Sequence, residues 1–488
     1  MKKLILAIDA GTTGSRVLAF NKNGKIKASA YYEIPQIYPK PAWVEHNPYD
    51  LFDTVKKALN DVIEKVGILN IDSIGITNQR ETTVLWHKKT GQPVHNAIVW
   101  QCRRTTSLCQ KLKPYAQIIK EKTGLFLDPY FSASKIQWIL ENTPNLKAEI
   151  KKGNILFGTV DTWLLWNLTG GKAHKSEPSN ASRTMLYNIH KNAFDPELLK
   201  IFNIPSNILP EIQESASVFG MLDKKLFGQE IPITGILGDQ QASLFGQGSL
   251  WKKNIIKNTY GTGLFLMATT KNKTNLSQNL ITTIAWQIKG KLTYALEGSV
   301  FTGGAAIQWL RDGLKIIKNA QETEKLARSL DSNEGVYFIP ALSGLGAPYW
   351  DPEARGLFTG LTRATTPRHF ARAALEAICY QTKDLVNEFN LSLNSSVKTL
   401  RADGGASNNN FLMQFQADIL NLPVERPKIT ETTAFGAAAI AGLTSGFWDK
   451  NSFLKIIEIE KTFQPHLAES LRQKYYQTYQ KALKKCLS

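Results

Sequence analysis

The chain has 488 residues, which is too long for one ordinary hydrophobic core and predicts two or three domains. Hydrophobic residues make up 43% of it and charged residues 20%, a balance typical of a soluble globular protein. The formal net charge of +18 would suit a nucleic-acid or membrane partner. The lysines are scattered, however, and form no block of five or more like charges, so we expect no nucleic-acid partner.

Cysteine usage and hydropathy favour the cytoplasm. The four cysteines form no CxxC pair and have no histidines at zinc spacing, so we expect neither disulfides nor a metal centre built from them. The apolar run at the start ends at Asp9, too early for a signal peptide. The longest small-apolar segment, residues 434–443, is far shorter than the ~20 residues of a membrane span. We expect a cytoplasmic protein with no stable membrane insertion.

The first predicted element is a hairpin over residues 4–20, in which two apolar β-type runs flank a polar turn. The turn contains Asp9, two glycines, three hydroxyl side chains and Arg16. Glycine allows a ligand to approach the backbone closely, and hydroxyl and N–H donors suit phosphate oxygens. Asp9 would suit a Mg²⁺ ion held against those phosphates. An ordinary hairpin turn is the alternative interpretation.

The next elements are a strand over 25–34, a surface loop over 35–48 and a helix over 50–66, followed by strands near 74–77, 82–86 and 97–100. Four polar residues, 78–81, follow the first of these three strands. Strand ends of α/β proteins often carry ligands, and the donors of Arg80 with the acceptors of Glu81 suit vicinal hydroxyls. On its own, this pair is better explained as a structural ion pair on the surface.

A helix is predicted from about 104 to 122, an amphipathic segment over 134–140, a strand-to-helix step at 158–163 and a polar loop over 180–184. A strand over 233–238 then ends in Gly-Asp-Gln, before a helix over 242–248. Asp239 has two interpretations at this place: a helix N-cap, or a general base ionised at neutral pH at the mouth of the sheet.

The second half repeats the plan of the first. Two β-type runs over 255–267 flank the turn Gly261-Thr262-Gly263, about half the chain length after Gly11. Two turns of the phosphate-binding type at this separation indicate a duplicated domain with a nucleotide between the halves. We therefore divide the chain into residues 1–248 and 249–488.

The later elements are strands near 282–286 and 292–296, a helix that begins on Gly303-Gly304, a strand over 337–340, a helix over 367–389 and a strand over 397–402. A Gly-Gly turn then precedes a helix over 410–420, a position suited to phosphate or ribose. Helices over 432–443 and 467–483 follow. No low-complexity linker occurs, so the halves should pack closely around a cleft.

Four stretches carry a family resemblance: GITNQRETT at 75–83, NAIVWQCRR at 96–104, GDQQ at 238–241 and GLGAPYWD at 344–351. In this order they resemble the glycerol kinases of the FGGY carbohydrate kinase family, within the actin/Hsp70/hexokinase-like superfamily. The resemblance extends over residues 5–448. The first two stretches resemble the glycerol-phosphorylating members rather than the pentulose kinases.

The resemblance implies an α/β fold of two duplicated actin-like (ribonuclease H-like) domains, each a mixed β-sheet flanked by helices, with an active-site cleft between them. The N-terminal domain would supply the glycerol pocket and the first phosphate turn, and the C-terminal domain would bind the nucleotide. The implied reaction is phosphorylation of glycerol by ATP, with Mg²⁺, to sn-glycerol 3-phosphate. A homodimer or homotetramer is implied as well.

The resemblance also assigns roles to individual residues. Asp239 would be the base that accepts the hydroxyl proton, and Asp9 and Asp239 would lie near Mg²⁺. The residues expected to bind glycerol are Arg80, Glu81, Trp100, Tyr130, Asp239, Gln240 and Phe265. The residues expected to hold ATP are Thr12, Thr13, Arg16, Thr262, Gly304, Gln308, Gly405 and Asn409.

Two departures from the family pattern stand out. Glycerol kinases usually carry Asp-Gln-Gly-Thr-Thr-Ser in the first turn, whereas Ala10 and Gly14 replace the Gln and the Ser here. Because the hydroxyl is missing at Gly14, the binding of the γ-phosphate, and with it the ATP affinity or the rate, is in doubt. Residues 219–230 contain neither the Gly-Gly-Thr-Arg of relatives that bind fructose 1,6-bisphosphate nor a phosphorylatable His. We predict no control by either route.

Three alternatives remain open from the sequence. The enzyme would phosphorylate another small polyol or ketose, such as glyceraldehyde, dihydroxyacetone or erythritol, although Arg80, Glu81 and the bulky Trp100 favour three carbons. The chain would otherwise be a non-catalytic nucleotide switch of the actin/Hsp70 kind, which an intact Asp239 argues against. A nucleic-acid-binding role is the weakest, because no basic stripe is present.

Overall fold

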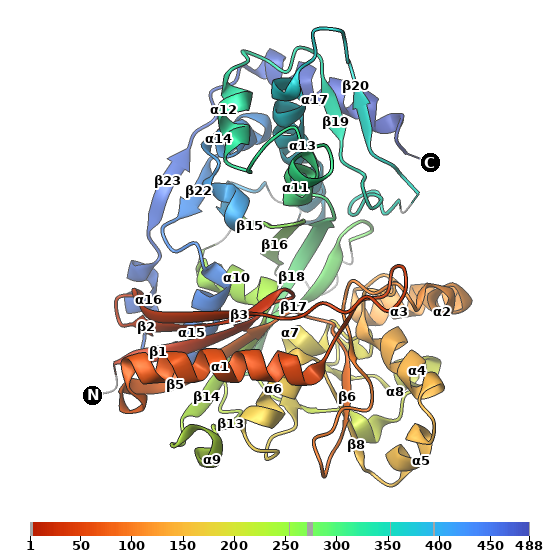
Figure 1. Cartoon of the computed structure of the whole chain (residues 1–488), viewed down its shortest axis with the longest axis vertical. Coiled ribbons are helices and arrows are strands. Elements are labelled where there is room, and N and C mark those ends of the chain that lie inside the picture. Colours follow the sequence, from red (N-terminus) through yellow and green to blue (C-terminus); the bar gives the residue numbers. More distant parts are fainter. Residues whose placement is uncertain (1–2, 253, 271–276, 352, 394–395, 488) are drawn as a thin grey trace.

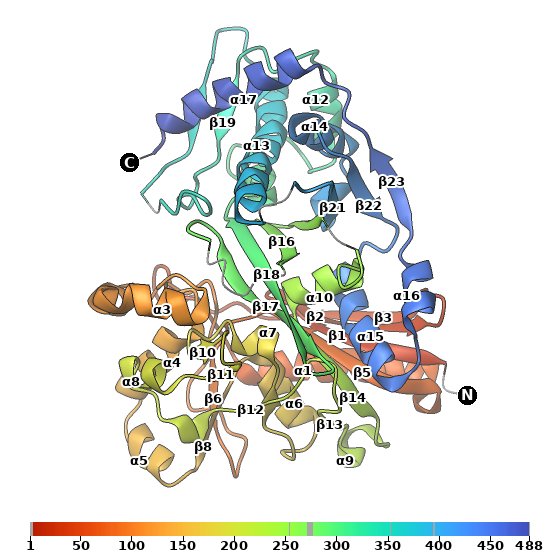
Figure 2. The ribbon, with the colours of Figure 1, turned by 180° about the vertical axis from the view of Figure 1, so that it is seen from behind.

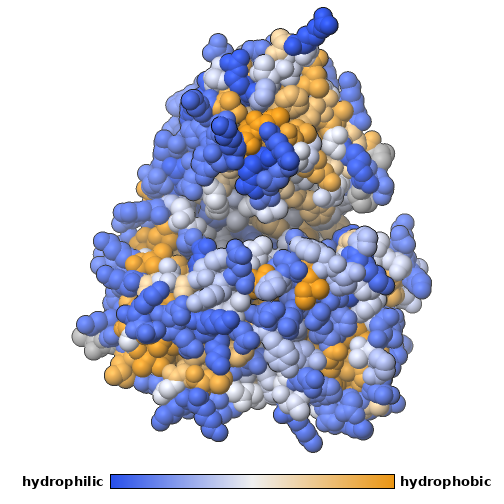
Figure 3. Space-filling model, viewed as in Figure 1, coloured by the Kyte–Doolittle hydropathy of each residue, from blue (hydrophilic) through white to orange (hydrophobic). Residues whose placement is uncertain are grey.

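The structure, a computed structural model, describes residues 3–252, 254–270, 277–351, 353–393 and 396–487. Within these ranges two large mixed sheets lie one above the other along the long axis of the molecule (Figure 1). The space-filling view shows that the surface is hollowed between the two halves (Figure 3). The expected pair of mixed α/β sheets flanked by helices is confirmed.

The first sheet has the strand order β13-β14-β5-β1-β2-β3 in the described part of the chain. Strands β1, β5 and β14 run parallel, whereas β2 pairs antiparallel with β1, and β3 pairs antiparallel with β2. The predicted first hairpin is confirmed as β1–β2. The strands are β1 (Leu4–Ala10), β2 (Gly14–Asn21), β3 (Ile26–Glu33), β5 (Ile71–Asn78), β13 (Gly220–Met221) and β14 (Pro232–Gly238).

One face of this sheet is covered by α1 (Pro48–Val66), with α6 (Val160–Leu168) beside it. Helix α1 begins where Asn47 caps it by accepting a hydrogen bond from the N–H of Tyr49, and Pro48 occupies the first turn. Its apolar residues, spaced for one helical face, pack onto the strands: Leu51, Val55, Leu59 and Val62 are buried.

The second sheet has the order β17-β18-β16-β15-β21-β22-β23 among the described residues. Its hairpin β15–β16 and the parallel pair β15–β21 repeat the hairpin β1–β2 and the parallel pair β1–β5 of the first sheet. This shared order confirms the predicted duplication. The strands are β15 (Ile255–Tyr260), β16 (Leu264–Thr270), β17 (Ile281–Ile288), β18 (Lys291–Val300), β21 (Thr399–Asp403), β22 (Val424–Pro427) and β23 (Ile459–Phe463).

The upper half also contains the long helix α13, which packs on β16 and β18 and carries the main core of this half. The other helices lie around it (Figure 1). These helices are α11 (Gly304–Asp312), α12 (Glu322–Arg328), α13 (Pro367–Leu393), α14 (Asn410–Leu420) and α17 (Glu469–Lys484).

Two helices meet at the centre of the molecule, α10 (Asp239–Gly246) and α15 (Thr432–Ser445). Their backbones are so close that a Cβ on Gly436 would lie 1.8 Å from the carbonyl oxygen of Ala242. Helix α15 also lies on the first sheet, on the face opposite to α1 (Figures 1 and 2). A Cβ on Gly75 of β5 would lie 2.0 Å from the carbonyl oxygen of Ala437, so glycine permits this contact.

The strands of the first sheet all precede residue 248 and those of the second all follow it, within the described ranges. Helix α15 nevertheless comes from the last quarter of the sequence and completes the core under the first sheet. The boundary after residue 248 therefore stays a prediction. It separates the strands of the two sheets, but it does not separate two independent hydrophobic cores.

Three local predictions were wrong. The polar loop at 180–184 is buried and begins inside helix α7 (Pro178–Ala181), because Glu177 caps this helix by accepting bonds from the N–H groups of Ser179 and Asn180. The helix over 104–122 is interrupted at Lys113-Pro114, since proline cannot continue it. The surface loop at 35–48 contains the buried strand β4 (Glu45–His46).

The remaining elements are short. They form two-stranded pairs and small helices at the margins of the two halves. The pairs are β4 with β7 (Ala97–Ile98), β6 (Val84–His87) with β8 (Ile155–Gly158), β9 (Lys175–Ser176) with β12 (Glu211–Ile212), β10 (Tyr187–Asn188) with β11 (Ala193–Phe194), and β19 (Tyr337–Ile339) with β20 (Leu357–Thr359). The helices are α2 (Thr106–Lys111), α3 (Ala116–Thr123), α4 (Ser132–Asn142), α5 (Leu146–Lys151), α8 (Pro196–Ile201), α9 (Lys224–Phe227) and α16 (Lys450–Ile456). Of the helices described, none combines the length and apolarity needed to cross a membrane.

Candidate active site

Three parallel neighbours of the first sheet, β1, β5 and β14, bring their carboxyl ends to one edge. In register, Asp9 of β1 lies opposite Thr77 of β5, and Asn78 of β5 lies opposite Gly238 of β14. The residues that follow β5 and β14 in the chain are therefore neighbours of Asp9. This arrangement places Asp9, Arg80 and Asp239 together where α/β sheets carry their ligands.

Arg80 is the centre of a buried charge network. Its Nη1 and Nη2 donate to the two carboxylate oxygens of Glu297, at 2.6 and 3.0 Å. Its Nε lies 3.0 Å from Oδ1 of Asp239, and Nη1 also donates to Oε1 of Gln241 at 3.1 Å. Only 2% of the Arg80 side chain is exposed, so this fork is held in one orientation.

Glu81 pairs with a second arginine rather than with its chain neighbour. Arg183 donates from Nε to Oε1 of Glu81 at 2.6 Å and from Nη2 to Oε1 of Glu297 at 3.2 Å. The Nε of Arg80 is 3.9 Å from the same oxygen of Glu81. The interpretation of Arg80 and Glu81 as a surface ion pair was wrong, because both side chains are buried and each has a stronger partner elsewhere.

Glu81 also has a positive φ of 62°, in the left-handed region that few residues other than glycine adopt. Such a conformation costs about 1–3 kcal/mol and persists where the surroundings fix it. Arg183 and the hydroxyl of Ser132, which donates to the carbonyl oxygen of Glu81 at 2.9 Å, provide these surroundings.

The network shifts the pKa values of its two carboxylates in opposite directions. Burial favours the neutral form of Glu297, but Arg183 and Arg80 outweigh it and lower its pKa to about 2. Burial raises the pKa of Glu81, and Arg183 and Arg80 only partly oppose the rise. Glu297 belongs to β18 of the second sheet, so a fixed negative charge from one half holds the arginines of the other.

An aromatic wall lies beside the network. The rings of Trp100 and Tyr130 have centroids 5.4 Å apart, and those of Trp100 and Phe265 are 6.4 Å apart. The guanidinium of Arg183 lies over Tyr130, 5.4 Å from its centroid. Trp100 and Tyr130 come from the first half and Phe265 from β16, so both halves build the wall.

Gln240 lies in the first turn of α10, next to Asp239, and is largely buried. Its Oε1 accepts a hydrogen bond from Nζ of Lys257 at 2.5 Å, and Lys257 also donates to the hydroxyl of Thr259 at 2.7 Å. Burial lowers the pKa of Lys257 to about 8, so this lysine brings a positive charge that titrates close to neutrality. Asp239 begins α10 rather than preceding it, and Gly238 occupies the N-cap position.

Asp9 and Asp239 form the acidic part of the edge. Burial and the negative charge of Asp239 raise the pKa of Asp9 to about 7, while Arg16 opposes the rise. A divalent cation would relieve this repulsion, so the pair fits Mg²⁺. Among the described residues no three His, Cys, Asp or Glu side chains form a metal cluster. Phosphate oxygens and waters commonly supply the other ligands of a Mg²⁺ ion that is bound by one or two carboxylates.

A backbone hydrogen bond within the first turn fixes its shape. The N–H of Gly11 donates to the carbonyl oxygen of Gly14 at 3.0 Å, and Thr13 is exposed. The hydroxyl of Thr12 accepts a 2.9 Å hydrogen bond from Nε1 of Trp100, which links the turn to the aromatic wall. Arg16 forms an ion pair with Glu431, at the start of α15.

The second turn lies against two other glycine-containing segments. The N–H of Gly304 donates to the carbonyl oxygen of Gly261 at 2.8 Å, and a Cβ on Gly404 would lie 2.6 Å from the carbonyl oxygen of Tyr260. Thr262, Gln308 and Gly405 are exposed around this contact, and Gly405 has open space where a Cβ would be. The structure thus brings together Thr262, Gly304 and Gly405 of the predicted nucleotide residues.

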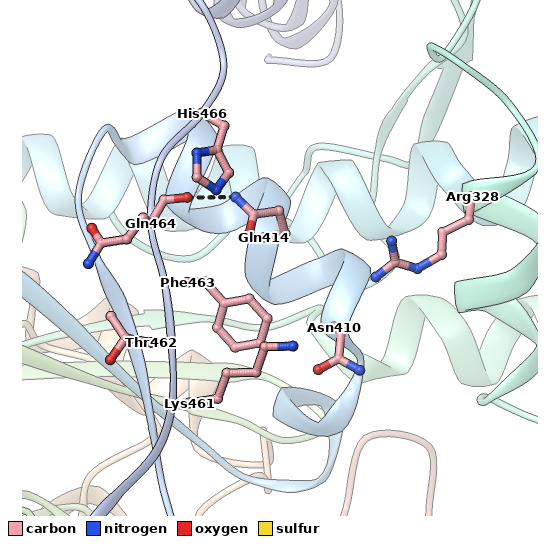
Figure 4. A pocket seen from close by; sticks show the side chains of 8 residues that line it. All are labelled: Arg328, Asn410, Gln414, Lys461, Thr462, Phe463, Gln464 and His466. Carbon is pink, nitrogen blue, oxygen red and sulfur yellow. Dashed lines mark hydrogen bonds between the residues drawn. The ribbon is translucent and has the colours of Figure 1, made fainter.

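Asn409 has a structural role of its own. It caps α14 by accepting a 3.0 Å hydrogen bond from the N–H of Leu412, and its Nδ2 donates to the hydroxyl of Thr323 at 3.3 Å. A cavity of about 360 Å³ lies next to it, between α14 and β23. The close-up shows Gln414 bonded to the backbone of Gln464 within this cavity (Figure 4). None of the predicted site residues lines it.

Sequence reasoning missed Arg183, Glu297 and Lys257. Arg183 lies in a segment that was interpreted as a polar loop. Lys257 lies in a predicted strand in which a binding role was assigned only to the adjoining turn. Glu297 was detectable in principle, since it is a single acid inside an otherwise apolar strand, Tyr294-Ala295-Leu296-Glu297-Gly298. A buried charge of this kind requires a partner.

Comparisons with known proteins find relatives over almost the whole length of the chain. Residues 4–246 match the N-terminal domain of the FGGY family of carbohydrate kinases, and residues 256–445 match its C-terminal domain. Glycerol kinase of Aquifex aeolicus (strain VF5) is 58% identical over 486 residues, 99% of each chain. Glycerol kinase of Bacillus subtilis (strain 168) is 50% identical over 495 residues, 100% of each chain.

A solved structure is similar over the same extent. The crystal structure of Plasmodium falciparum glycerol kinase with ADP superposes with a TM-score of 0.93 at 36% identity, covering 99% of this chain and 98% of that one. Its fold is that of the two actin-like domains expected from the sequence. The two matched domains, the full-length relatives and the shared fold lead to one conclusion: the chain belongs to the FGGY family of carbohydrate kinases.

Proposed function

We propose that this enzyme phosphorylates glycerol with ATP, giving sn-glycerol 3-phosphate. The observation that carries the proposal is the contact between the buried Arg80 and the partly exposed Asp239 beside the aromatic wall. It combines a rigid fork of donors, a carboxylate and an apolar surface, which are the contacts that a small polyol requires. The glycerol kinases that the chain resembles over its full length support the same substrate.

In this proposal the polyol binds by hydroxyl contacts on one side and carbon contacts on the other. Arg80, Glu81, Tyr130, Asp239 and Gln240 bind the hydroxyls. Trp100 and Phe265 pack against the carbon chain. A polyol that lacked a hydroxyl would leave part of this buried polar set unpaired, which is how such a site rejects close analogues.

Asp239 accepts the proton of the attacking hydroxyl. Its oxygen Oδ1 is oriented by Nε of Arg80 and by the N–H of Gln240 at 2.7 Å, while 29% of the side chain remains exposed for a substrate. A carboxylate held in this way can remove a proton as the new bond forms. Phosphoryl transfer depends mainly on positioning and charge neutralisation, so the proposed reaction needs no catalytic base besides Asp239.

The nucleotide binds across the cleft. In this proposal ATP is held by Thr12, Thr13 and Arg16 of the first half and by five residues of the second half: Thr262, Gly304, Gln308, Gly405 and Asn409. Asp9 and Asp239 would hold Mg²⁺, which would neutralise phosphate charge. The chain is proposed to act in the cytoplasm as a homodimer or homotetramer.

The test is a coupled ADP-release assay with a panel of small polyols and ketoses, with free phosphate measured in parallel. Glycerol-dependent ADP without free phosphate is the expected result. Activity on another polyol alone would keep the family and overturn the substrate. ADP with equal free phosphate, whatever the polyol, would instead mark an ATPase switch.

A further inference from the structure

Gly14 is a glycine for reasons of space. Its φ lies outside the left-handed region, so its backbone makes no demand for glycine. A Cβ at this position would lie 2.4 Å from the hydroxyl oxygen of Tyr31 and within 2.6 Å of two of its ring carbons. The edge of the Tyr31 phenol thus occupies the space in which a side chain of residue 14 would begin.

The Tyr31 side chain lies on the face of the sheet that carries Arg16. Tyr31 pairs in register with Arg16, whose guanidinium carbon lies 5.4 Å from the ring centroid. The neighbouring residues point to the other face, where Ser15 contacts the hydroxyl of Thr54 at 3.0 Å and Tyr32 donates to Asp61 at 2.7 Å. Tyr31 therefore shares a face with Gly14 and Arg16 of the first turn.

The Tyr31 hydroxyl is available for a ligand. The residue is 46% exposed, and within the described ranges its hydroxyl makes no hydrogen bond to the protein. The ring is nevertheless held in place, between Arg16 and the backbone of Gly14. An ordered ring that carries a free O–H donor beside hydroxyls of a phosphate-type turn has the chemistry of an anion contact.

We propose that the Tyr31 hydroxyl replaces the side-chain hydroxyl absent at residue 14 and donates a hydrogen bond to the terminal phosphate of the nucleotide. The proposal rests on the proposed function, because it assumes that a nucleoside triphosphate binds at the first turn. It explains how the turn departs from the family pattern at Gly14 without losing a donor: the donor comes from the adjacent strand.

The test compares Tyr31→Phe with the wild-type enzyme. The substitution removes the hydroxyl and keeps the ring against Gly14 and Arg16. Binding of Mg²⁺ with a non-hydrolysable ATP analogue, measured by calorimetry, should weaken by about tenfold or more, the effect of losing one hydrogen bond to a charged group. Binding of ADP and the KM for glycerol should not change. Tyr32→Phe, on the other face of β3, is the matched control and should bind both nucleotides normally.

A hydroxyl exchange makes the test sharper. Gly14→Ser alone should impair binding of the analogue, because the new side chain collides with Tyr31. In Tyr31→Ala the space is open, so Gly14→Ser in that background should recover most of the affinity that Tyr31→Ala has lost. Recovery would show that the hydroxyl, and not the ring, is what the terminal phosphate requires.

Two results would overturn the proposal: equal affinity of Tyr31→Phe and wild type for the analogue, or equal losses for the analogue and ADP. These outcomes are separate from a failure of the proposed function. If wild type released no ADP in response to glycerol, the substrate assignment would fail, while the binding comparison would still decide the role of Tyr31.

Discussion

The two sides of the cleft are built differently. On the side that we propose for the polyol, Arg80, Glu81, Arg183 and Glu297 are buried and bonded to one another before any ligand binds. On the side that we propose for the nucleotide, Thr13, Thr262 and Gly405 are exposed, and the hydrogen bonds within the turns come from the backbone. The first arrangement would fix the shape of a site for a small neutral substrate in advance, whereas the second would leave donors unpaired for a charged ligand.

Asp239 joins the two sides, and its removal should have the largest effect. Asp239→Asn keeps the size of the side chain but cannot accept the hydroxyl proton, so kcat should fall by about 10³-fold. Much of the glycerol affinity should remain, because the donors around the polyol are unchanged. Steady-state kinetics with glycerol binding measured separately checks this. Asp312→Asn, at an exposed carboxylate, is the control. Wild-type turnover in Asp239→Asn would remove Asp239 from the role of base.

Glu297→Gln tests whether the polyol side is pre-assembled from both halves. The neutral amide leaves Arg80 and Arg183 without their shared carboxylate, and losing one partner of a buried ion pair costs about 3–5 kcal/mol. The free energy of unfolding in urea should fall by this amount, and the KM for glycerol should rise far more than the KM for ATP. Arg183→Lys, which keeps the charge, provides a milder second variant.

The control for this prediction is Glu353→Gln, whose carboxylate is 75% exposed and lies 3.8 Å from Arg355. Its stability should stay within about 0.5 kcal/mol of wild type. Equal KM changes for glycerol and ATP in Glu297→Gln would contradict a special link between Glu297 and the polyol side.

The pH dependence of Mg²⁺ binding tests the role proposed for Asp9 on the nucleotide side. Because the pKa of Asp9 is about 7 without the ion, a proton competes with Mg²⁺ at this carboxylate. The apparent Mg²⁺ affinity should therefore fall as pH drops below 7, approaching about tenfold per pH unit. The measurement is the Mg²⁺ dependence of ADP release at pH 6, 7 and 8. Asp9→Asn should bind Mg²⁺ weakly at every pH. A pH-independent requirement in wild type would contradict the assignment.

The smallest effects should distinguish two adjacent glycines on the nucleotide side. Gly404 has a φ of 83° and no room for a Cβ, so Gly404→Ala should lower stability by about 1–3 kcal/mol. Gly405 faces open space, so Gly405→Ala should leave stability within about 0.5 kcal/mol of wild type and raise the KM for ATP a few-fold. Thermal unfolding and ATP kinetics of the two variants check this. An unchanged KM for ATP in Gly405→Ala would argue against nucleotide at that surface.

Much of this architecture was predictable because its signals are local. The hairpins β1–β2 and β15–β16 combine apolar runs with glycine-containing turns, and their similarity within one chain reveals the duplication. Arg80 and Asp239 were also identified, since each lies within two residues of the end of a strand. These features depend on residues that are close together in the sequence.

The partners of Arg80 were beyond local patterns. Glu297 is 217 positions away from it, and Arg183 is 102 positions away from Glu81. Arg183 follows Asn-Ala-Ser, a composition typical of exposed loops. Only the packing of the halves shows that this segment is buried. Tyr31 was equally hidden, because its link to Gly14 is a matter of space between two strands.

Helix α15 has a consequence for the synthesis of the protein. It supplies the apolar layer under the first sheet, where Ala437 and Ile440 pack near Ile5 and Leu237, yet it leaves the ribosome after some four hundred other residues. Until then, one face of β1, β5 and β14 has no cover. Between the synthesis of β14 and that of α15, the nascent first half would therefore expose this apolar face on the ribosome, and a chaperone would be expected to bind it. A fragment that ended at residue 248 would remain in that condition permanently.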